Sequence, residues 1–343
     1  MTVARRLAGI LVGGTLAASL ALYAQTPPIE FRPLPDPVQR FVDRMVGAHG
    51  FDRAALHDLF AALAPSKGVQ RAISAPSTAK PWHEFRPLFV DPSRVENGVK
   101  FWNANADLLL RAESQFGVPA AVIVSIIGIE TRYGRVTGSF RIVDALYTLG
   151  FEGDNRPEFF RSELEQFLLL AREQRWDARQ VKGSYAGAMG WPQFMPSSYR
   201  RYAVDFDADG RVDLWTSMAD VIGSVASYLA QFGWKTGQPF AVQVQVEGDP
   251  EQLPGIGYEP AFTVDQWRMR GVDAPADTPD ALAGGLFRLD VANGVEYWIG
   301  FDNFYAVLRY NRSRHYAMAV WQLAQEITAA RERLLAASEP VLR

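Results

Sequence analysis

The sequence predicts a mainly α protein of the α+β class, with a small β-rich segment inserted before the last helix. Two observations lead to this prediction. Apolar residues recur at helical spacing through much of residues 38–232. Residues 241–246, Ala-Val-Gln-Val-Gln-Val, alternate with the two-residue period of a strand. A chain of 343 residues has room for two or three lobes, so the two kinds of structure can occupy separate parts.

The first part of the chain is expected to be helical. Apolar residues within 38–63 predict two short helices, which residues 47–50 separate. Residues 65–81 are rich in Ser, Ala and Pro and are expected to form a loop. A single amphipathic helix is expected over 95–116, because the pattern is continuous there and Gly117 can end it.

The next helix is expected to begin after Pro119, whose missing N–H is not needed in a first helical turn. Residues 120–129 are apolar on almost every side, so this helix is expected to be buried. Apolar spacing predicts further helices over 159–173 and 218–232, and a last one over 317–335.

Residues 239–300 carry the β signals. The alternating segment 241–246 is followed by Pro- and Gly-rich sequence and then by two apolar runs, 286–291 and 295–299. The residues between these runs include Asn293-Gly294, which predicts a β-hairpin with an Asn-Gly turn.

The composition narrows the classes of function. Hydrophobic residues make up 48% and charged residues 21%, which is typical of a globular protein and not of a disordered one. The net charge of -3 provides no basic field, so we expect no nucleic-acid partner. The absence of Cys excludes disulfides, cysteine nucleophiles, thiolate metal sites and a lipid on an N-terminal Cys.

The N-terminus is typical of an export signal. Arg5 and Arg6 precede residues 7–23, which are uncharged and mostly apolar. This order predicts that residues 1–24 are a signal peptide cleaved after Ala24, or an anchor that is kept in the membrane. No second run of the chain is long and apolar enough to span a membrane.

The first candidate for chemistry is Glu130, at the end of the buried helix. Apolar surroundings disfavour the charged form of a carboxyl group and raise its pKa, as a general acid at neutral pH requires. The alternative is a structural Glu130 that reaches solvent or pairs with Arg132 or Arg135.

A second candidate is the segment 182–199, which is rich in Gly and aromatic residues. Ser184 and Gln193 are short polar groups among these aromatics. Such a surface suits a sugar, whose apolar face stacks on rings while its hydroxyl and amide groups form hydrogen bonds. The alternative is a packed loop in which these polar groups are satisfied by the protein.

The third candidate is a metal loop that starts at Asp205. Asp205, Asp207 and Asp209, followed by Gly210, match the beginning of an EF-hand loop. Two further expected ligands are the Arg211 carbonyl and Asp220, which would close the site from the next helix, since Thr216 stands at the twelfth position. The alternative is a loop of Asx turns without a metal.

Four motifs in order resemble the lytic murein transglycosylase B family of bacterial cell-wall enzymes. They are Gly-Ile-Glu-Thr-Arg-Tyr-Gly-Arg around Glu130, the segment 183–199, the EF-hand-like loop, and Arg-Tyr-Asn-Arg-Ser-Arg-His-Tyr-Ala-Met at 309–318. The resemblance covers about residues 35–330 and implies a lysozyme-like catalytic core. It favours the catalytic interpretation of Glu130.

The resemblance implies cleavage of the β-1,4 bond between N-acetylmuramic acid and N-acetylglucosamine, which leaves a 1,6-anhydromuramyl end. Glu130 would act as the general acid and then as the base. An aromatic cleft position is assigned to Phe85, which lacks the hydroxyl of a tyrosine. The other positions assigned to glycan contact are Ser184, Gln193, Tyr228, Tyr310, Asn311 and Tyr316.

The family's metal is calcium, and the ligands assigned by resemblance are Asp205, Asp207, Asp209, Arg211 and Asp220. We expect a structural Ca²⁺, with Na⁺ as the alternative, and no organic cofactor. The expected location is the periplasm, without a lipid anchor because there is no Cys. The expected partners are peptidoglycan glycan strands and cell-wall synthesis or division proteins, and the expected state is a monomer.

Two other functions stay open at this point. A hydrolytic muramidase would need a second carboxylate opposite Glu130, and Asp144 and Glu152 are candidates by their place in the chain. A non-catalytic peptidoglycan-binding scaffold could use the same aromatic cleft.

The expected parts of the chain follow from the motifs and the change to β signals. They are the signal or anchor (1–24), an α lobe (30–118) to which the C-terminal helix (317–336) returns, a lysozyme-like catalytic core (119–238) with the EF-hand-like loop (205–220), a β-rich lobe (239–300) and a cleft segment (301–316).

Overall fold

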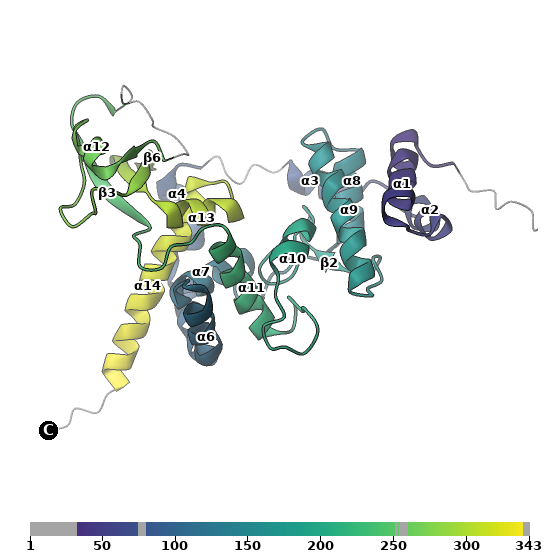
Figure 1. The fold of residues 1–343 in the computed structure, drawn as a ribbon, viewed down its shortest axis with the longest axis horizontal. Helices are drawn as coiled ribbons and strands as arrows, with labels where there is room; N and C mark the ends of the chain where they lie inside the picture. The colour runs from purple at the N-terminus through teal and green to yellow at the C-terminus, as the bar shows by residue number, and fades with distance from the viewer. Residues whose placement is uncertain (1–32, 75–79, 251–252, 254–259, 339–343) are drawn as a thin grey trace, which may run out of the picture.

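The computed structural model describes residues 33–74, 80–250, 253 and 260–338. The expected signal or anchor at 1–24 lies outside these residues. Figure 1 shows an elongated molecule with its larger β-sheet at one end and the two N-terminal helices at the other.

Helices precede the larger sheet in the chain. They are α1 (Asp36–His49), α2 (Arg53–Ala61), α3 (Lys67–Ile73), α4 (Trp82–Phe89), α5 (Pro92–Ala104), α6 (Ala106–Phe116), α7 (Ala120–Thr131), α8 (Ile142–Phe151), α9 (Pro157–Glu173), α10 (Pro196–Tyr202) and α11 (Met218–Gln231). Short side chains cap several of them: Asp52 accepts a hydrogen bond from the Ala55 N–H at 2.7 Å, and Ser217 accepts one from the Asp220 N–H at 3.2 Å.

Helix α7 is the centre of the main core. Every residue from Ala120 to Ile129 is buried, as expected for a helix that is apolar on almost every side. It contacts α5, α6, α11 and the C-terminal helix α14 (Arg314–Ser338), so helices from both ends of the chain surround it. The end of α7 is therefore positioned by several packed elements.

The expectation of one helix over 95–116 is wrong, because the chain breaks at Asn105 between α5 and α6. The Asn105 side chain donates to the Phe101 carbonyl at 2.9 Å, and its own N–H reaches the carbonyls of Phe101 and Trp102. This local bonding competes with continuation of the helix. The break lets α5 pack on α7 and α14 while α6 packs on α11.

The expectation of a loop throughout 65–81 is also wrong. Helix α3 occupies residues 67–73, and Ser66 caps it by accepting a hydrogen bond from the Val69 N–H at 3.4 Å. Val69 is fully buried, so tertiary packing stabilises a helix that the local composition does not favour.

The larger sheet has five strands in the order β4 (Phe262–Thr263), β6 (Ala283–Val291), β7 (Gly294–Gly300), β3 (Ala241–Val246) and β5 (Val272–Asp273), all paired antiparallel. Helix α12 (Val264–Arg268) packs on it around the fully buried Trp267. The strand at 241–246 and the hairpin are confirmed. Val291 pairs with Gly294, so the two loop residues are Ala292 and Asn293, and not Asn-Gly.

Three further elements matter for the candidate site. Strands β1 (Phe140–Arg141) and β2 (Lys182–Gly183) form a small antiparallel sheet, and α13 (Asp302–Tyr310) leads into α14. Across the described residues, no single helix is long and apolar enough to cross a membrane. The bent pair α6 and α7, at 113°, passes that test only when both helices are taken together.

Candidate active site

Glu130 lies in the last turn of α7, where the buried helix reaches the surface. After it, Arg132 and Tyr133 adopt left-handed backbone conformations, with φ of 51° and 58°, and turn the chain back. The Tyr133 ring then covers Gly128, where a Cβ atom would lie 2.4 Å from the tyrosine hydroxyl. Gly128 therefore allows the close turn that follows Glu130.

The carboxyl group of Glu130 contacts one side chain in particular. The Tyr316 hydroxyl donates a hydrogen bond to Glu130 Oε1 at 2.5 Å, across 186 positions of sequence. Burial of the carboxyl group raises the pKa of Glu130 to about 7, and the hydrogen bond from Tyr316 partly opposes that rise. Within the described part of the chain Glu130 forms no ion pair, and Arg135 donates instead to Asn97 at 2.9 Å. At neutral pH the carboxyl group can therefore both give and take a proton.

Two more of the predicted tyrosines lie beside Tyr316. The rings of Tyr310 and Tyr316 are nearly parallel at 6.4 Å, and Tyr228 lies 4.7 Å from Tyr310. The Tyr310 hydroxyl donates to the Pro192 carbonyl, and the Tyr228 hydroxyl to the Arg309 carbonyl, both at 2.6 Å. Burial raises the pKa of all three hydroxyl groups, so they remain neutral donors beside Glu130.

Ser184 follows β2 and is fixed by the loop after it. Its Oγ accepts hydrogen bonds from the N–H groups of Ala186 and Ala188, at 3.2 and 3.0 Å. A hydroxyl that accepts two bonds still has its hydrogen to donate. Ser184 is therefore oriented by the protein and keeps a donor for a ligand.

Gln193 is held in a similar way. Its side-chain amide nitrogen donates to the carbonyls of Gly190 and Thr137, at 2.9 and 3.2 Å, and its backbone is left-handed with φ of 52°. The preceding residue, Pro192, accepts the Tyr310 hydrogen bond, which places Gln193 beside Tyr310. Its amide oxygen remains an acceptor.

The remaining two predicted glycan contacts, Asn311 and Phe85, differ in how far they are exposed. Asn311 is exposed immediately after α13. Phe85 is only 4% exposed and packs against Phe89 and His315, with ring centroids at 4.8 and 5.3 Å. The ring of Phe85 therefore supports the residue before Tyr316 and offers little of its own surface.

The two candidates for a second carboxylate lie on α8 and immediately after it. Asp144 pairs with Arg141 at 2.6 Å in the first turn of α8, and Glu152 is exposed beyond the end of that helix. No hydrogen bond joins Glu130 to another carboxyl group within the described ranges.

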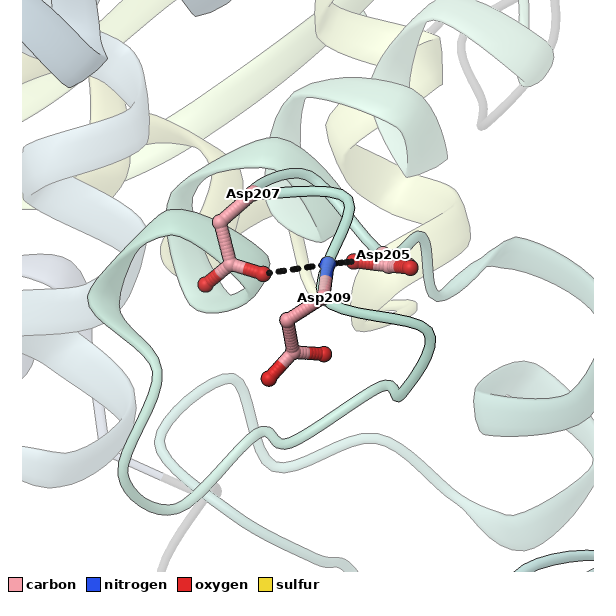
Figure 2. Close-up of side chains that lie close together, drawn as sticks. All are labelled: Asp205, Asp207 and Asp209. Atoms are coloured by element: carbon pink, nitrogen blue, oxygen red, sulfur yellow. Dashed lines mark hydrogen bonds between the residues drawn. The ribbon is translucent and has the colours of Figure 1, made fainter.

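The acidic loop brings three of its expected ligands together. Oxygen atoms of Asp205, Asp207 and Asp209 lie within 4.8 Å of one another, and Figure 2 shows these side chains around one turn of the loop. The Asp209 N–H lies between the other two carboxylates, at 3.1 Å from Asp205 Oδ1 and 3.3 Å from Asp207 Oδ1. Oxygen donors at this spacing suit Ca²⁺ better than a softer transition metal.

Asp220 is not part of this close group of three carboxylates. It is buried, and its two oxygens accept the N–H groups of Phe206 and Asp213, both at 2.7 Å. It thereby braces the loop from α11. Each oxygen accepts one of these bonds, which leaves lone pairs that a cation could use.

Comparison with known proteins decides the family. The Transglycosylase SLT domain family matches residues 35–325. Membrane-bound lytic murein transglycosylase B of Escherichia coli (strain K12) is 46% identical over 305 residues, which cover 85% of this chain and 83% of that protein. The chain belongs to the MltB-type lytic transglycosylase family.

Solved structures confirm the predicted fold class of this transglycosylase. Soluble lytic transglycosylase SltB1 from Pseudomonas aeruginosa is 47% identical with a TM-score of 0.80, covering 86% of this chain and 99% of that one. Lytic transglycosylase Slt35 from Escherichia coli, in complex with calcium, is 45% identical with a TM-score of 0.78, covering 87% and 94%. The protein is thus a mainly α, lysozyme-like α+β enzyme, a lytic transglycosylase.

Sequence reasoning missed Arg94 in this transglycosylase. Its side chain is buried and donates to the carbonyls of Leu88 and Gly128, at 2.7 and 3.2 Å. Its own carbonyl accepts the Tyr133 hydroxyl at 3.0 Å. Arg94 therefore joins α5 to the end of α7, next to Glu130. An arginine in an amphipathic helix is usually exposed, so no local signal marks it.

The Tyr316 contact predicts a pH effect. We propose below that Glu130 is the general acid, which must be protonated, so cleavage should slow as pH rises through its pKa of about 7. Tyr316→Phe removes a donor that favours the charged form, so the pKa should rise and the alkaline limb of the pH–rate profile should move to higher pH. The maximal rate should fall by about tenfold at most.

The profile is measured as anhydromuropeptide release from pH 5 to 9. Tyr297→Phe, which makes the same change in β7, is the control and should leave the profile unaltered. A limb that stays in place or moves to lower pH in Tyr316→Phe would disprove the assigned hydrogen bond.

Proposed function

We propose that this transglycosylase cleaves the β-1,4 bond between N-acetylmuramic acid and N-acetylglucosamine and forms 1,6-anhydromuramyl ends, with Glu130 as acid and then base. The observation that carries the proposal is the Glu130 carboxyl group, which has a pKa of about 7 and accepts a hydrogen bond from the Tyr316 hydroxyl. A carboxyl group of this kind can work in both directions at neutral pH.

In the first step, protonated Glu130 donates its proton to the glycosidic oxygen as the bond from C1 to that oxygen breaks. The departing N-acetylglucosamine keeps the glycosidic oxygen as a free hydroxyl group, and C1 gains positive charge. The muramic acid's own N-acetyl oxygen can stabilise C1. This route requires no second protein carboxylate.

In the second step, ionised Glu130 takes the proton from the C6 hydroxyl as that oxygen bonds to C1. The bond closes the 1,6-anhydro ring, consumes no water and restores protonated Glu130. The nucleophile belongs to the same sugar, so its effective concentration is high. The Tyr316 hydroxyl would stabilise the ionised carboxylate between the two steps.

The other cleft residues would bind and orient the glycan. Ser184 has a hydrogen to donate and would hold the N-acetyl carbonyl, while the Gln193 amide oxygen would accept from a sugar hydroxyl or amide. Tyr228 and Tyr310 would shape the wall of the cleft beside Tyr316. Asn311 would contact the glycan directly. We propose that Phe85 acts mainly by supporting His315.

Ligands of relatives support the substrate class. SltB3 from Pseudomonas aeruginosa, 31% identical with a TM-score of 0.71, has been solved with NAG-NAM-pentapeptide and with NAG-anhNAM-pentapeptide. Slt35 has been solved with bulgecin A. We infer that peptidoglycan strands are the substrate here as well. A monomeric state and contacts with cell-wall synthesis or division proteins remain predictions.

Mass spectrometry of the soluble products from purified sacculi tests the reaction. Anhydro ends, one water lighter than reducing ends, are expected with the wild-type protein and absent without it. Reducing ends would instead identify a hydrolytic muramidase and reopen the search for a second carboxylate.

We infer that the enzyme acts in the cell envelope and, more specifically, in the periplasm. The name of the Escherichia coli relative includes "membrane-bound", and residues 1–24 have the pattern of a signal or anchor. No Cys is present to carry a lipid, so we propose a cleaved signal or a protein anchor.

We propose the same division of the chain as the sequence suggests. Residues 119–238 would form the catalytic core, 30–118 with 317–336 the α lobe, 239–300 the β-rich lobe and 301–316 the cleft segment. The contacts of α14 with α5 and α7 support the return of the C-terminal helix. The separate core around Trp267 supports the β-rich lobe.

We propose that the acidic loop holds a structural Ca²⁺ through Asp205, Asp207, Asp209 and the Arg211 carbonyl, closed by Asp220. The Slt35 complex with calcium supports this assignment. Calcium at 100 times its dissociation constant should stabilise the fold by about 2.7 kcal/mol, and a chelator should reverse the effect. Differential scanning fluorimetry with and without calcium measures the shift.

Asp209→Asn removes one charge from the loop and should abolish most of the calcium-dependent shift. Asp107→Asn makes the same change in α6 and should leave it intact. An equal shift with Na⁺ alone would assign the site to sodium. No shift with either ion would show that the loop binds neither metal.

A further inference from the structure

A hollow lies where the C-terminal end of α9 meets the acidic loop. It has a volume of about 980 Å³, within the range of small-ligand sites. Its walls are residues 173–177, 180–182 and 210–213 together with Trp215. None of the residues assigned to the Glu130 cleft is among them, although Lys182 stands only two positions before Ser184.

Tryptophan side chains form part of its wall. Trp176 and Trp215 are both half-buried, and their rings meet edge to face at 5.5 Å and 85°. Tyr199 packs against both from the protein side. The indole surface that stays accessible is rigidly held, and such surfaces bind the apolar faces of sugars.

The cations of the hollow are available to a ligand. Arg175, Lys182 and Arg211 line it, and among the described residues none of their side chains forms a hydrogen bond or an ion pair. Of the carboxylates there, Glu173 pairs with Arg200, and Asp213 accepts the N–H groups of Trp215 and Thr216. Asp177 forms no ion pair with any described residue. The hollow thus presents both signs of charge beside its aromatic wall.

Arg175 is held in a conformation that its residue type disfavours. Its φ of 57° is left-handed, and this position after a helix usually carries Gly. A glycine here would relieve the backbone but would remove a cation from the rim.

We propose that this hollow is a second peptidoglycan-binding site, which takes a sugar–peptide unit outside the Glu130 cleft. A sugar ring would lie against the indole surface. The carboxylates of the stem peptide would meet Arg175 and Lys182, and a stem amino group would meet Asp177. The inference rests on peptidoglycan being the substrate. Its purpose would be to hold the enzyme on the sacculus, because two linked contacts bind an extended polymer more tightly than one.

Arg175→Gly provides a test in which loss of folding is not expected, because glycine suits the left-handed backbone. It should keep or raise the midpoint of thermal unfolding. In an inactive Glu130→Gln background it should weaken co-sedimentation with purified sacculi by about three- to tenfold. In the active enzyme, turnover of a short soluble glycan fragment should not change.

Arg156→Gly is the matched control, because Arg156 is also left-handed, with φ of 55°, and lies at the opposite end of α9. Its sacculus affinity should equal that of the parent. Unchanged affinity in Arg175→Gly would overturn the proposal. If both variants lose sacculus affinity equally, the cause is the general loss of positive charge, and the proposal is overturned too. If Arg175→Gly loses fragment turnover as well as sacculus binding, Arg175 belongs to the Glu130 cleft and not to a separate site. Failure of the wild-type enzyme to release anhydro ends would instead refute the proposed reaction, independently of this comparison.

Discussion

Glu130→Gln is expected to lower the rate of anhydromuropeptide release by at least about a thousandfold. The amide has nearly the shape of the carboxyl group but can neither donate a proton to the glycosidic oxygen nor accept one from the C6 hydroxyl. The Tyr316 hydroxyl can still donate to the amide oxygen, so the local structure should be retained. Release is measured by mass spectrometry of products from purified sacculi.

The same substitution should affect stability in a pH-dependent way. The pKa of Glu130 is raised from 4.5 to about 7 in the folded protein. The protonated form is therefore favoured by folding, and this stabilisation, present below the unfolded pKa, is lost as pH rises through about 7. At pH 8 the buried charge opposes folding by up to roughly 3 kcal/mol, and glutamine removes that cost.

Urea unfolding at pH 5 and pH 8 measures this difference. Glu130→Gln should be more stable than the wild type at pH 8, and the gain should shrink at pH 5. Glu152→Gln changes an exposed carboxyl group beyond α8 and should alter neither activity nor stability. A Glu130→Gln protein that still cleaves at the wild-type rate would remove Glu130 from the mechanism.

Arg94→Met should destabilise the protein by about 3 kcal/mol. The guanidinium group is buried and joins the Leu88 carbonyl, the Gly128 carbonyl and Asp91, with Nη1 3.1 Å from Asp91 Oδ2. Methionine fills similar space but offers no donor. The Leu88 carbonyl and the Asp91 carboxylate would lose their buried partner.

Arg40→Met is the matched control for Arg94→Met, because Arg40 is exposed in α1. Its free energy of unfolding should stay within about 0.5 kcal/mol of the wild type. If both variants unfold at the same urea concentration, Arg94 does not join α5 to α7 in the way described.

The sequence by itself determined the features that depend on neighbouring residues. Apolar residues on all sides of 120–129 made α7 a buried helix, and alternation made 241–246 a strand. Asp205, Asp207 and Asp209 converge because alternate positions of one tight loop are neighbours in space. Each of these outcomes follows from interactions over a few residues, which a local pattern contains.

Only the tertiary structure determines the pKa of Glu130. Tyr316 lies 186 positions away and reaches it through the packing of α14 on α7. The buried place of Arg94 likewise depends on which helices meet. The pKa of a carboxyl group and the burial of an arginine are determined by desolvation and by contacts between distant segments. These are properties of the packed chain, and no local pattern records them.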